Sequence, residues 1–128
     1  MQMLLFVACG GAVGALSRFA LTSWLAPFFK PGMPWATFVI NVCGSFLIGV
    51  SYILITEKGI LPETWRPLII TGFLGALTTY SSFALETVAL FERELPLHAL
   101  LYMLSSVCCT VIAAALGIGL MRLVFNSL

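Results

Sequence analysis

Residues 72–83 read GFLGALTTYSSF, and this stretch lies inside a long apolar segment that would otherwise suit a helix. It contains Gly72 and Gly75, followed by an unbroken run of hydroxyl-bearing residues from Thr78 to Ser82. Glycine loses much backbone freedom in a helix and β-branched threonine loses side-chain freedom, so both are poor helix formers. The stretch therefore favours a helix that is interrupted near its middle.

An interruption of this kind frees backbone groups that need partners. At membrane depth such backbone is tolerated only where it is buried in protein or lines a cavity that holds water or ions. Exposed carbonyls suit a cation, whereas exposed N–H groups and hydroxyls suit an anion. The alternative is an unbroken helix whose serines and threonines bond to the preceding turn. The stretch by itself leaves both readings open.

The composition around this stretch is that of a membrane protein. Of the 128 residues, 61% are hydrophobic and only 9% are charged, whereas about a quarter of the residues in an ordinary soluble domain are charged. A spanning helix needs about 20 mostly apolar residues. Segments of that kind, separated by prolines and glycines, cover residues 3–26, 35–56, 67–91 and 97–124. We predict an all-α membrane protein with one domain (residues 1–128) and four transmembrane helices.

The ends of these segments carry further signals. Trp24, Trp35 and Trp65 lie at segment ends, where the amphipathic indole favours the membrane interface. The N-terminal sequence MQMLLFVACGG lacks the basic flank of a signal peptide. We therefore expect the first segment to remain in the protein as a transmembrane span.

Basic residues are distributed almost evenly between the two sides of the predicted membrane. An even number of spans places both termini on one side, together with Lys58, Arg66 and Arg122. The other side has Lys30 and Arg93, and also Arg18 if its long side chain reaches that interface. Such a balance removes the bias that normally fixes orientation. We hypothesise that the chain inserts in both orientations and pairs as an antiparallel, dual-topology homodimer.

The charges and cysteines exclude several classes of function. No run of like charges is present, which argues against nucleic acid as a partner. The cysteines all lie in apolar segments, without a CxxC motif and without a nearby histidine: Cys9, Cys43, Cys108 and Cys109. We expect them to act as small hydrophobic residues buried in the membrane and not as metal ligands or disulfides.

Small residues in the first span suggest close helix packing. Gly10 and Gly14 form a GxxxG motif, and Gly11 and Ala15 follow one position later. Such residues let two helices approach each other closely. The motif is compatible with packing inside one subunit and with packing between two subunits, and the sequence does not decide between them.

Three polar side chains at membrane depth are candidates for function, because such groups are costly there. Arg18 suits either an anion-attracting vestibule or an interfacial anchor. Glu86 follows Ser82 and Thr78 at helical spacing, so we expect these three residues to share a face. Glu86 then either acts in function or makes an interhelical hydrogen bond. Asn41, the only amide in the second span, must face protein or water, where it either binds a ligand or joins helices.

The aromatic residues of the opening stretch also share a helical face. Tyr80 and Phe83 are three residues apart, so their rings can contact each other. The edge of an aromatic ring carries a partial positive charge and can face a small anion without trapping it. Plain packing explains the same spacing.

Three motifs together resemble the Fluc/CrcB family of fluoride channels. They are GGAVGALSRF in the first span, WATFVINVCGSFLIG in the second and GFLGALTTYSSFALET in the third, which is close to the family's GFxGGxTTFSTF. The resemblance extends over essentially the whole chain, although only position and hydrophobicity support it in the fourth span. It implies an antiparallel, dual-topology homodimer with a broken third helix in each subunit and with paired pores, which is not an enzyme. Such a channel passes fluoride down its gradient across the cytoplasmic membrane of a microbe and so confers fluoride resistance.

The resemblance also implies site residues. The fluoride pathway would be lined by amide, aromatic and hydroxyl groups, namely Asn41, Tyr80, Phe83, Ser81, Ser82, Ser106 and Thr110. Arg18 would lie near a vestibule. A structural sodium ion at the dimer interface would bind the backbone carbonyls of Gly75 and Thr78.

The chain departs from the family pattern at two positions. Ala76 replaces a common glycine, with little expected effect because Gly75 remains. Tyr80 replaces the usual phenylalanine and adds a hydroxyl, which is both donor and acceptor, to a narrow path. We expect Tyr80 to preserve fold and selectivity but to slow conduction.

Two other functions compete with this reading. A small multidrug-resistance type exporter also has four spans, but it would need a carboxylate in the first span to exchange protons for organic cations. The first span here contains Arg18 and no acid. A structural subunit of a larger membrane complex would show no transport as a purified chain.

Overall fold

The computed structural model describes residues 1–29 and 32–127, and in this part of the chain every regular element is helical. Lys30, part of the predicted charge balance, lies outside the described residues. In chain order the elements are α1 (Gln2–Leu25), η1 (Ala26–Phe28), α2 (Trp35–Tyr52), η2 (Ile53–Glu57), η3 (Glu63–Trp65), η4 (Pro67–Leu74), α3 (Gly75–Leu77), α4 (Tyr80–Glu92) and α5 (Pro96–Asn126). The elements η2 and η4 are π-helical, and η1 and η3 are short 3₁₀ turns.

The four predicted spans are confirmed. Helical segments long and apolar enough to cross a membrane are Gln2–Phe28, Trp35–Glu57, Glu63–Glu92 and Pro96–Asn126, within a few residues of the predicted ranges. The chain is thus a multi-pass membrane protein. The third segment begins earlier than predicted because the turn η3 precedes Pro67, whose ring suits the first position of a helix.

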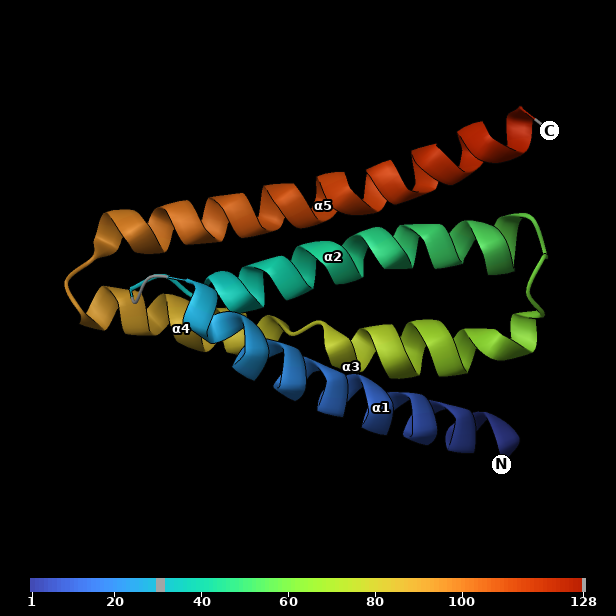
Figure 1. Cartoon of the computed structure of the whole chain (residues 1–128), viewed down its shortest axis with the longest axis horizontal. Helices are drawn as coiled ribbons and strands as arrows, with labels where there is room; N and C mark the ends of the chain where they lie inside the picture. Colours follow the sequence, from blue (N-terminus) through green and yellow to red (C-terminus); the bar gives the residue numbers. More distant parts are fainter. Residues whose placement is uncertain (30–31, 128) are drawn as a thin grey trace.

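Both termini lie at the same end of the bundle, beside the connection between the second and third spans (Figure 1). The other two connections lie at the opposite end (Figure 1). α1 packs along η4 and α3, α2 packs along α5, and α4 also contacts α5. This arrangement is the one expected for an even number of spans.

Close backbone contact joins α1 to the third span. Gly10 and Gly14 are buried, and a Cβ atom at these positions would collide with the backbone oxygens of Leu68 and Phe73, respectively. Gly11 has no heavy atom within 4 Å of its Cβ position. The GxxxG motif therefore packs α1 inside its own subunit, which answers the question that the sequence left open.

Two apolar clusters hold the remaining spans together. One cluster joins α4 to α5 through Phe83, Leu90, Ala99 and Tyr102. The other joins α2 to the first half of the third span through Ile40, Leu74 and Leu77. The two clusters therefore fix the position of α2, α4 and α5 around the point where α3 and α4 meet.

Thr78 and Thr79 separate α3 from α4. Both residues have extended backbones, with φ and ψ of −80° and 154° at Thr78 and of −148° and 119° at Thr79. α4 starts only at Tyr80. The prediction that Thr78 shares a helical face with Ser82 and Glu86 is therefore wrong, because Thr78 precedes the helix on which the other two lie.

Candidate functional site

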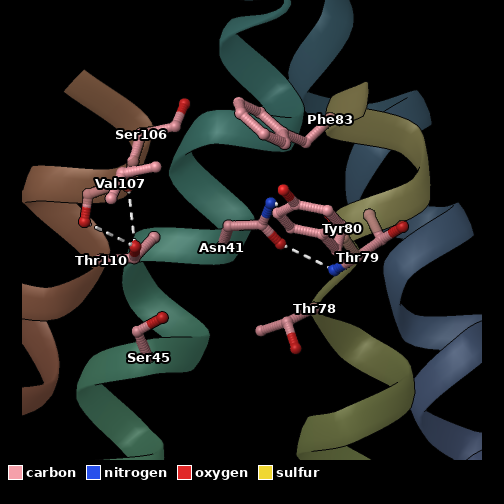
Figure 2. A pocket seen from close by; sticks show the side chains of 9 residues that line it. All are labelled: Asn41, Ser45, Thr78, Thr79, Tyr80, Phe83, Ser106, Val107 and Thr110. Carbon is pink, nitrogen blue, oxygen red and sulfur yellow. Dashed lines mark hydrogen bonds between the residues drawn. The ribbon is translucent and has the colours of Figure 1, made fainter. Parts of the chain in front are cut away.

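A cavity of about 330 Å³ lies beside this junction, between α2, α5 and the start of α4 (Figure 2). Its lining contains amide, hydroxyl, aromatic and aliphatic side chains and no charged one: Asn41, Ser45, Thr78, Thr79, Tyr80, Phe83, Ser106, Val107 and Thr110. The cavity thus brings together six of the predicted site residues. Ser81, Ser82, Arg18 and Gly75 lie outside its lining.

Asn41 binds the backbone of the junction. Its Oδ1 accepts a hydrogen bond from the Thr79 N–H at 2.8 Å (Figure 2). Its Nδ2 donates to the Thr79 carbonyl at 3.0 Å. An amide nitrogen carries two hydrogens, so one N–H of Asn41 remains for another acceptor. Asn41 therefore satisfies both polar backbone groups of Thr79 and links α2 to the junction.

The Thr79 side chain caps α4. Its Oγ1 accepts a hydrogen bond from the Ser82 N–H at 3.1 Å and lies 3.1 Å from the Ser82 hydroxyl. Threonine is a preferred residue at this position because its oxygen satisfies an N–H that has no partner inside the helix. The Thr79 cap therefore explains why the backbone is extended at Thr79 and why α4 starts at Tyr80.

These bonds release two carbonyl oxygens. In a continuous helix, the N–H groups of Thr79 and Ser82 would bond the carbonyls of Gly75 and Thr78, four residues earlier. Here they donate to Asn41 and to the Thr79 side chain instead. Carbonyl oxygens suit a hard cation such as sodium, so the residues present fit the ion that the resemblance implies.

No cluster of three or more histidines, cysteines or acidic residues occurs among residues 1–29 and 32–127.

The Thr78 side chain is held on both sides. Its hydroxyl donates to the Leu74 carbonyl at 2.9 Å. Its methyl carbon occupies the space where a side chain at Gly44 would start. Because the hydroxyl is engaged in this way, the free polar group of Thr78 is its carbonyl.

Three aromatic rings form a series from the surface inward. The ring centroids of Tyr80 and Phe83 are 5.4 Å apart, and those of Phe83 and Tyr102 are 5.3 Å apart, with planes tilted by 48° in both pairs. Phe83 is 9% exposed, whereas Tyr80 is 79% exposed in the single subunit. The predicted contact between Tyr80 and Phe83 is thus confirmed, and the Tyr80 ring lies at the open side of the cavity (Figure 2).

The two predicted hydroxyls of α5 differ in their bonding. The Thr110 hydroxyl donates to the Ser106 carbonyl at 2.7 Å, in the usual manner of a threonine inside a helix. The Ser106 hydroxyl is buried and has no hydrogen-bond partner among the residues described. A buried hydroxyl without a partner is costly, so Ser106 is the one of the two whose hydroxyl still needs a partner.

A second cavity, of about 260 Å³, lies on the other side of the junction. Its lining includes Arg18 from α1, Thr37 from α2, and Ser82 and Glu86 from α4. The Glu86 carboxylate accepts hydrogen bonds from the Thr37 hydroxyl at 2.7 Å and from the Tyr102 hydroxyl at 2.8 Å. Glu86 therefore makes the interhelical bonds that were one of its two expected roles.

Ser81 lies at the surface of the chain. Its side chain is exposed, and its hydroxyl lies 3.2 Å from the Thr79 hydroxyl. Ser81 therefore continues the hydroxyl run at the start of α4 but lines neither the cavity beside Asn41 nor the cavity beside Arg18.

Sequence reasoning missed four residues that shape the site. Thr79 had a usable signal, because a threonine before an apolar helical segment is a typical cap. Ser45 also had one, because it follows Asn41 by four residues on the same helix. Thr37 and Tyr102 had none, since only the packing of α2 and α5 against α4 brings them to Glu86.

Comparison with known proteins agrees with this picture. The CrcB-like protein family, Camphor Resistance (CrcB), matches residues 5–118. A protein of Hahella chejuensis named fluoride-specific ion channel FluC is 41% identical over 121 residues, which cover 94% of this chain and 95% of that protein. Proteins with the same name from Magnetococcus marinus and Aeromonas salmonicida are 42% and 45% identical, over 93% and 80% of this chain and 97% and 82% of theirs.

These relatives are named as ion channels, in agreement with the expectation that the chain is not an enzyme. The family match covers most of the chain, including the Asn41 segment and the junction at Thr78 and Thr79. The chain therefore belongs to the CrcB-like family.

Proposed function

We propose that the chain is the subunit of a passive, fluoride-selective channel in the cytoplasmic membrane of a microbe. Fluoride leaves the cell down its gradient through this channel, which gives resistance to fluoride. The relatives that share about two fifths of their residues with this chain carry the name of a fluoride-specific channel. The observation in the structure that supports the proposal best is a polar cavity without charged residues at the junction of α3 and α4.

The chemistry of the cavity suits a small, strongly hydrated anion. A pore must replace the water around fluoride with donors, yet bind it weakly enough to release it. The free N–H of Asn41, the Ser106 hydroxyl and the ring edges of Tyr80 and Phe83 are uncharged groups that meet both requirements. The amino end of α4 faces the same region and favours negative charge.

The exposure of the site supports assembly as a homodimer with two pores. Tyr80 is 79% exposed although it belongs to the middle of a membrane span. Interrupted backbone at this depth needs protein or water around it, and a second copy of the chain would supply the missing wall. Nearly equal basic charge at both ends of the bundle favours an antiparallel arrangement of the two copies. In this arrangement each pore is lined by both subunits.

A structural sodium ion at the centre of the dimer is part of the proposal. The carbonyls of Gly75 and Thr78 lack the N–H partners that they would have in a continuous helix. Their two copies in a symmetric dimer would supply the oxygen ligands of one cation. The ion would neutralise the partial negative charge of these oxygens and hold the two broken third helices together.

The competing function of a proton-coupled exporter of organic cations receives no support from the site. The first span contains no acidic residue. Glu86, which lies inside the third span, has both carboxylate oxygens engaged by hydroxyl donors from other helices. These bonds favour a carboxylate that fixes the packing of helices over one that exchanges cations.

The proposal is tested by anion efflux from liposomes that contain the purified chain. Liposomes loaded with fluoride or with chloride are diluted into salt-free buffer, and a potassium ionophore balances the charge. Release of fluoride without chloride is the expected result. Release of neither ion by the chain and by its Tyr80→Phe variant would contradict the proposal and favour a structural subunit. Uptake of an organic cation driven by a proton gradient would favour the exporter.

A further inference from the structure

Ser45 lines the cavity at the junction of α3 and α4 but has no role in the pathway described so far. It lies on α2, four residues after Asn41, and therefore on the same face of the helix. Figure 2 shows its side chain in the space between Thr110 and Thr78, with the hydroxyl directed into the cavity. The position is about 6 Å along the helix axis from Asn41, at a rise of about 1.5 Å per residue.

The Ser45 hydroxyl is not engaged by the preceding turn of its helix. Serine and threonine inside a helix usually donate to the preceding turn, as Thr87, Ser105 and Thr110 do at 2.8, 2.6 and 2.7 Å. Within residues 1–29 and 32–127, Ser45 takes part in no hydrogen bond of this kind. A free donor at membrane depth needs water or an ion as its partner.

Ser106 contributes a second unpartnered hydroxyl to the lining of this cavity. It lies on α5, across the cavity from the junction, and is only 6% exposed. Its hydroxyl has no protein partner in the described chain. The lining of this cavity thus contains two hydroxyls from different helices, together with the free N–H of Asn41, that have no acceptor in the described chain.

We propose that Ser45 is a further anion-contacting residue, which receives the ion one helical turn away from Asn41. This inference rests on the proposed function. The hydroxyl acts as a donor to the anion, because the carbonyl oxygens of Gly75 and Thr78 are the better cation ligands nearby. A second uncharged donor at this distance lets the ion move on without meeting a strong binding site.

Fluoride efflux from liposomes tests the proposal with a pair of variants of equal shape. Ser45→Thr keeps the hydroxyl, whereas Ser45→Val replaces it with a methyl group. Ser45→Ala removes the hydroxyl without adding bulk. Ser51→Ala on the same helix, outside the cavity lining, is the matched control. Gel filtration of each variant checks assembly.

We expect Ser45→Ala and Ser45→Val to slow fluoride release by about three- to tenfold, the effect of one lost neutral hydrogen bond. Ser45→Thr and Ser51→Ala should stay near the wild-type rate. Wild-type release by Ser45→Ala would overturn the inference, and so would equal slowing by Ser45→Thr and Ser45→Val. If Ser45→Ala fails to assemble, the comparison of Ser45→Thr with Ser45→Val tests the inference. Failure of all three variants to assemble would assign Ser45 a packing role and would also overturn the inference. A wild-type chain that releases no fluoride would reject the proposed function itself.

Discussion

At the scale of single residues, Tyr80 combines a polar group with a position at the open side of the cavity. Its ring contacts Phe83, and its hydroxyl adds a donor and an acceptor that a phenylalanine would lack. An extra hydrogen-bonding group in a narrow path holds a passing ion longer. The consequence for conduction follows directly from this chemistry.

We therefore predict that Tyr80→Phe raises the rate of fluoride release by about two- to tenfold, as for the removal of one weak binding contact. Chloride should remain excluded, because the other donors are unchanged. Liposome efflux measures both ions, and Tyr52→Phe at the end of α2 controls for loss of a tyrosine hydroxyl elsewhere. An unchanged or slower rate for Tyr80→Phe would count against this role.

Asn41 is the residue on which the junction depends. Asn41→Leu keeps the approximate size of the side chain but leaves the N–H and the carbonyl of Thr79 without partners. We expect a loss of about 1–3 kcal/mol of stability for each unpaired group, seen as a lower unfolding temperature in detergent, together with loss of fluoride release. Asn126→Leu, at the end of α5, is the control. An unfolding temperature equal to that of the wild type would contradict the role of Asn41.

Sequence reasoning recognised these residues but not the bonds between them. The amide of Asn41 and the hydroxyl run after Leu77 are costly in a membrane, which is why the sequence alone marks them as candidates. The pairing of Asn41 with the Thr79 backbone depends on the position of α2 beside the junction. A sequence contains the polar groups, whereas only the fold decides which of them are satisfied by protein and which remain for a ligand.

At the scale of helices, close contact between α1 and the third span rests on two glycines. Gly14→Ala would drive a methyl group into the backbone oxygen of Phe73. Overpacking of this kind costs about 1–3 kcal/mol. We expect a lower unfolding temperature in detergent for Gly14→Ala. Gly11→Ala, where the new methyl group meets nothing within 4 Å, should leave the temperature unchanged or slightly higher.

The bounds of the spans were predictable because hydropathy and punctuation by proline and glycine both report on the membrane boundary. The internal geometry of the spans was not. The π-helical stretches η2 and η4 have no evident signal in their sequences ILITE and PLIITGFL. Their hydrogen-bond pattern depends on packing, as the close approach of η4 to Gly10 and Gly14 illustrates.

At the scale of the whole molecule, the balance of basic residues predicts dual topology. Ser127→Cys places a thiol at an exposed position outside the spans that contain the native cysteines. A membrane-impermeant thiol reagent should label this variant to a roughly equal extent in right-side-out and inverted membrane vesicles, because neither orientation is favoured. Labelling in only one kind of vesicle would contradict dual topology.

The choice of neighbours in the bundle could not be predicted from hydrophobicity. Each span is apolar around most of its surface, so no single face points to a partner. In the structure the close contacts are made by small residues, with Gly49 against the Ala114 carbonyl and Gly117 against the Phe46 carbonyl. Close approach at such positions joins membrane helices. Because glycines occur in every span, the sequence does not show which helix each glycine packs against, and only the structure does.

The bonds between Asn41 and Thr79 also have a consequence for synthesis of the protein. The second span leaves the ribosome before the third, so the amide of Asn41 is already in the membrane when the backbone of Thr79 arrives. The partner that bonds the N–H and the carbonyl of Thr79 in the folded chain is thus synthesised first. In a circular permutant that is translated with the third span first, the same groups would enter the bilayer before their partner exists. The order of the spans along the gene is thus part of how this chain reaches its fold.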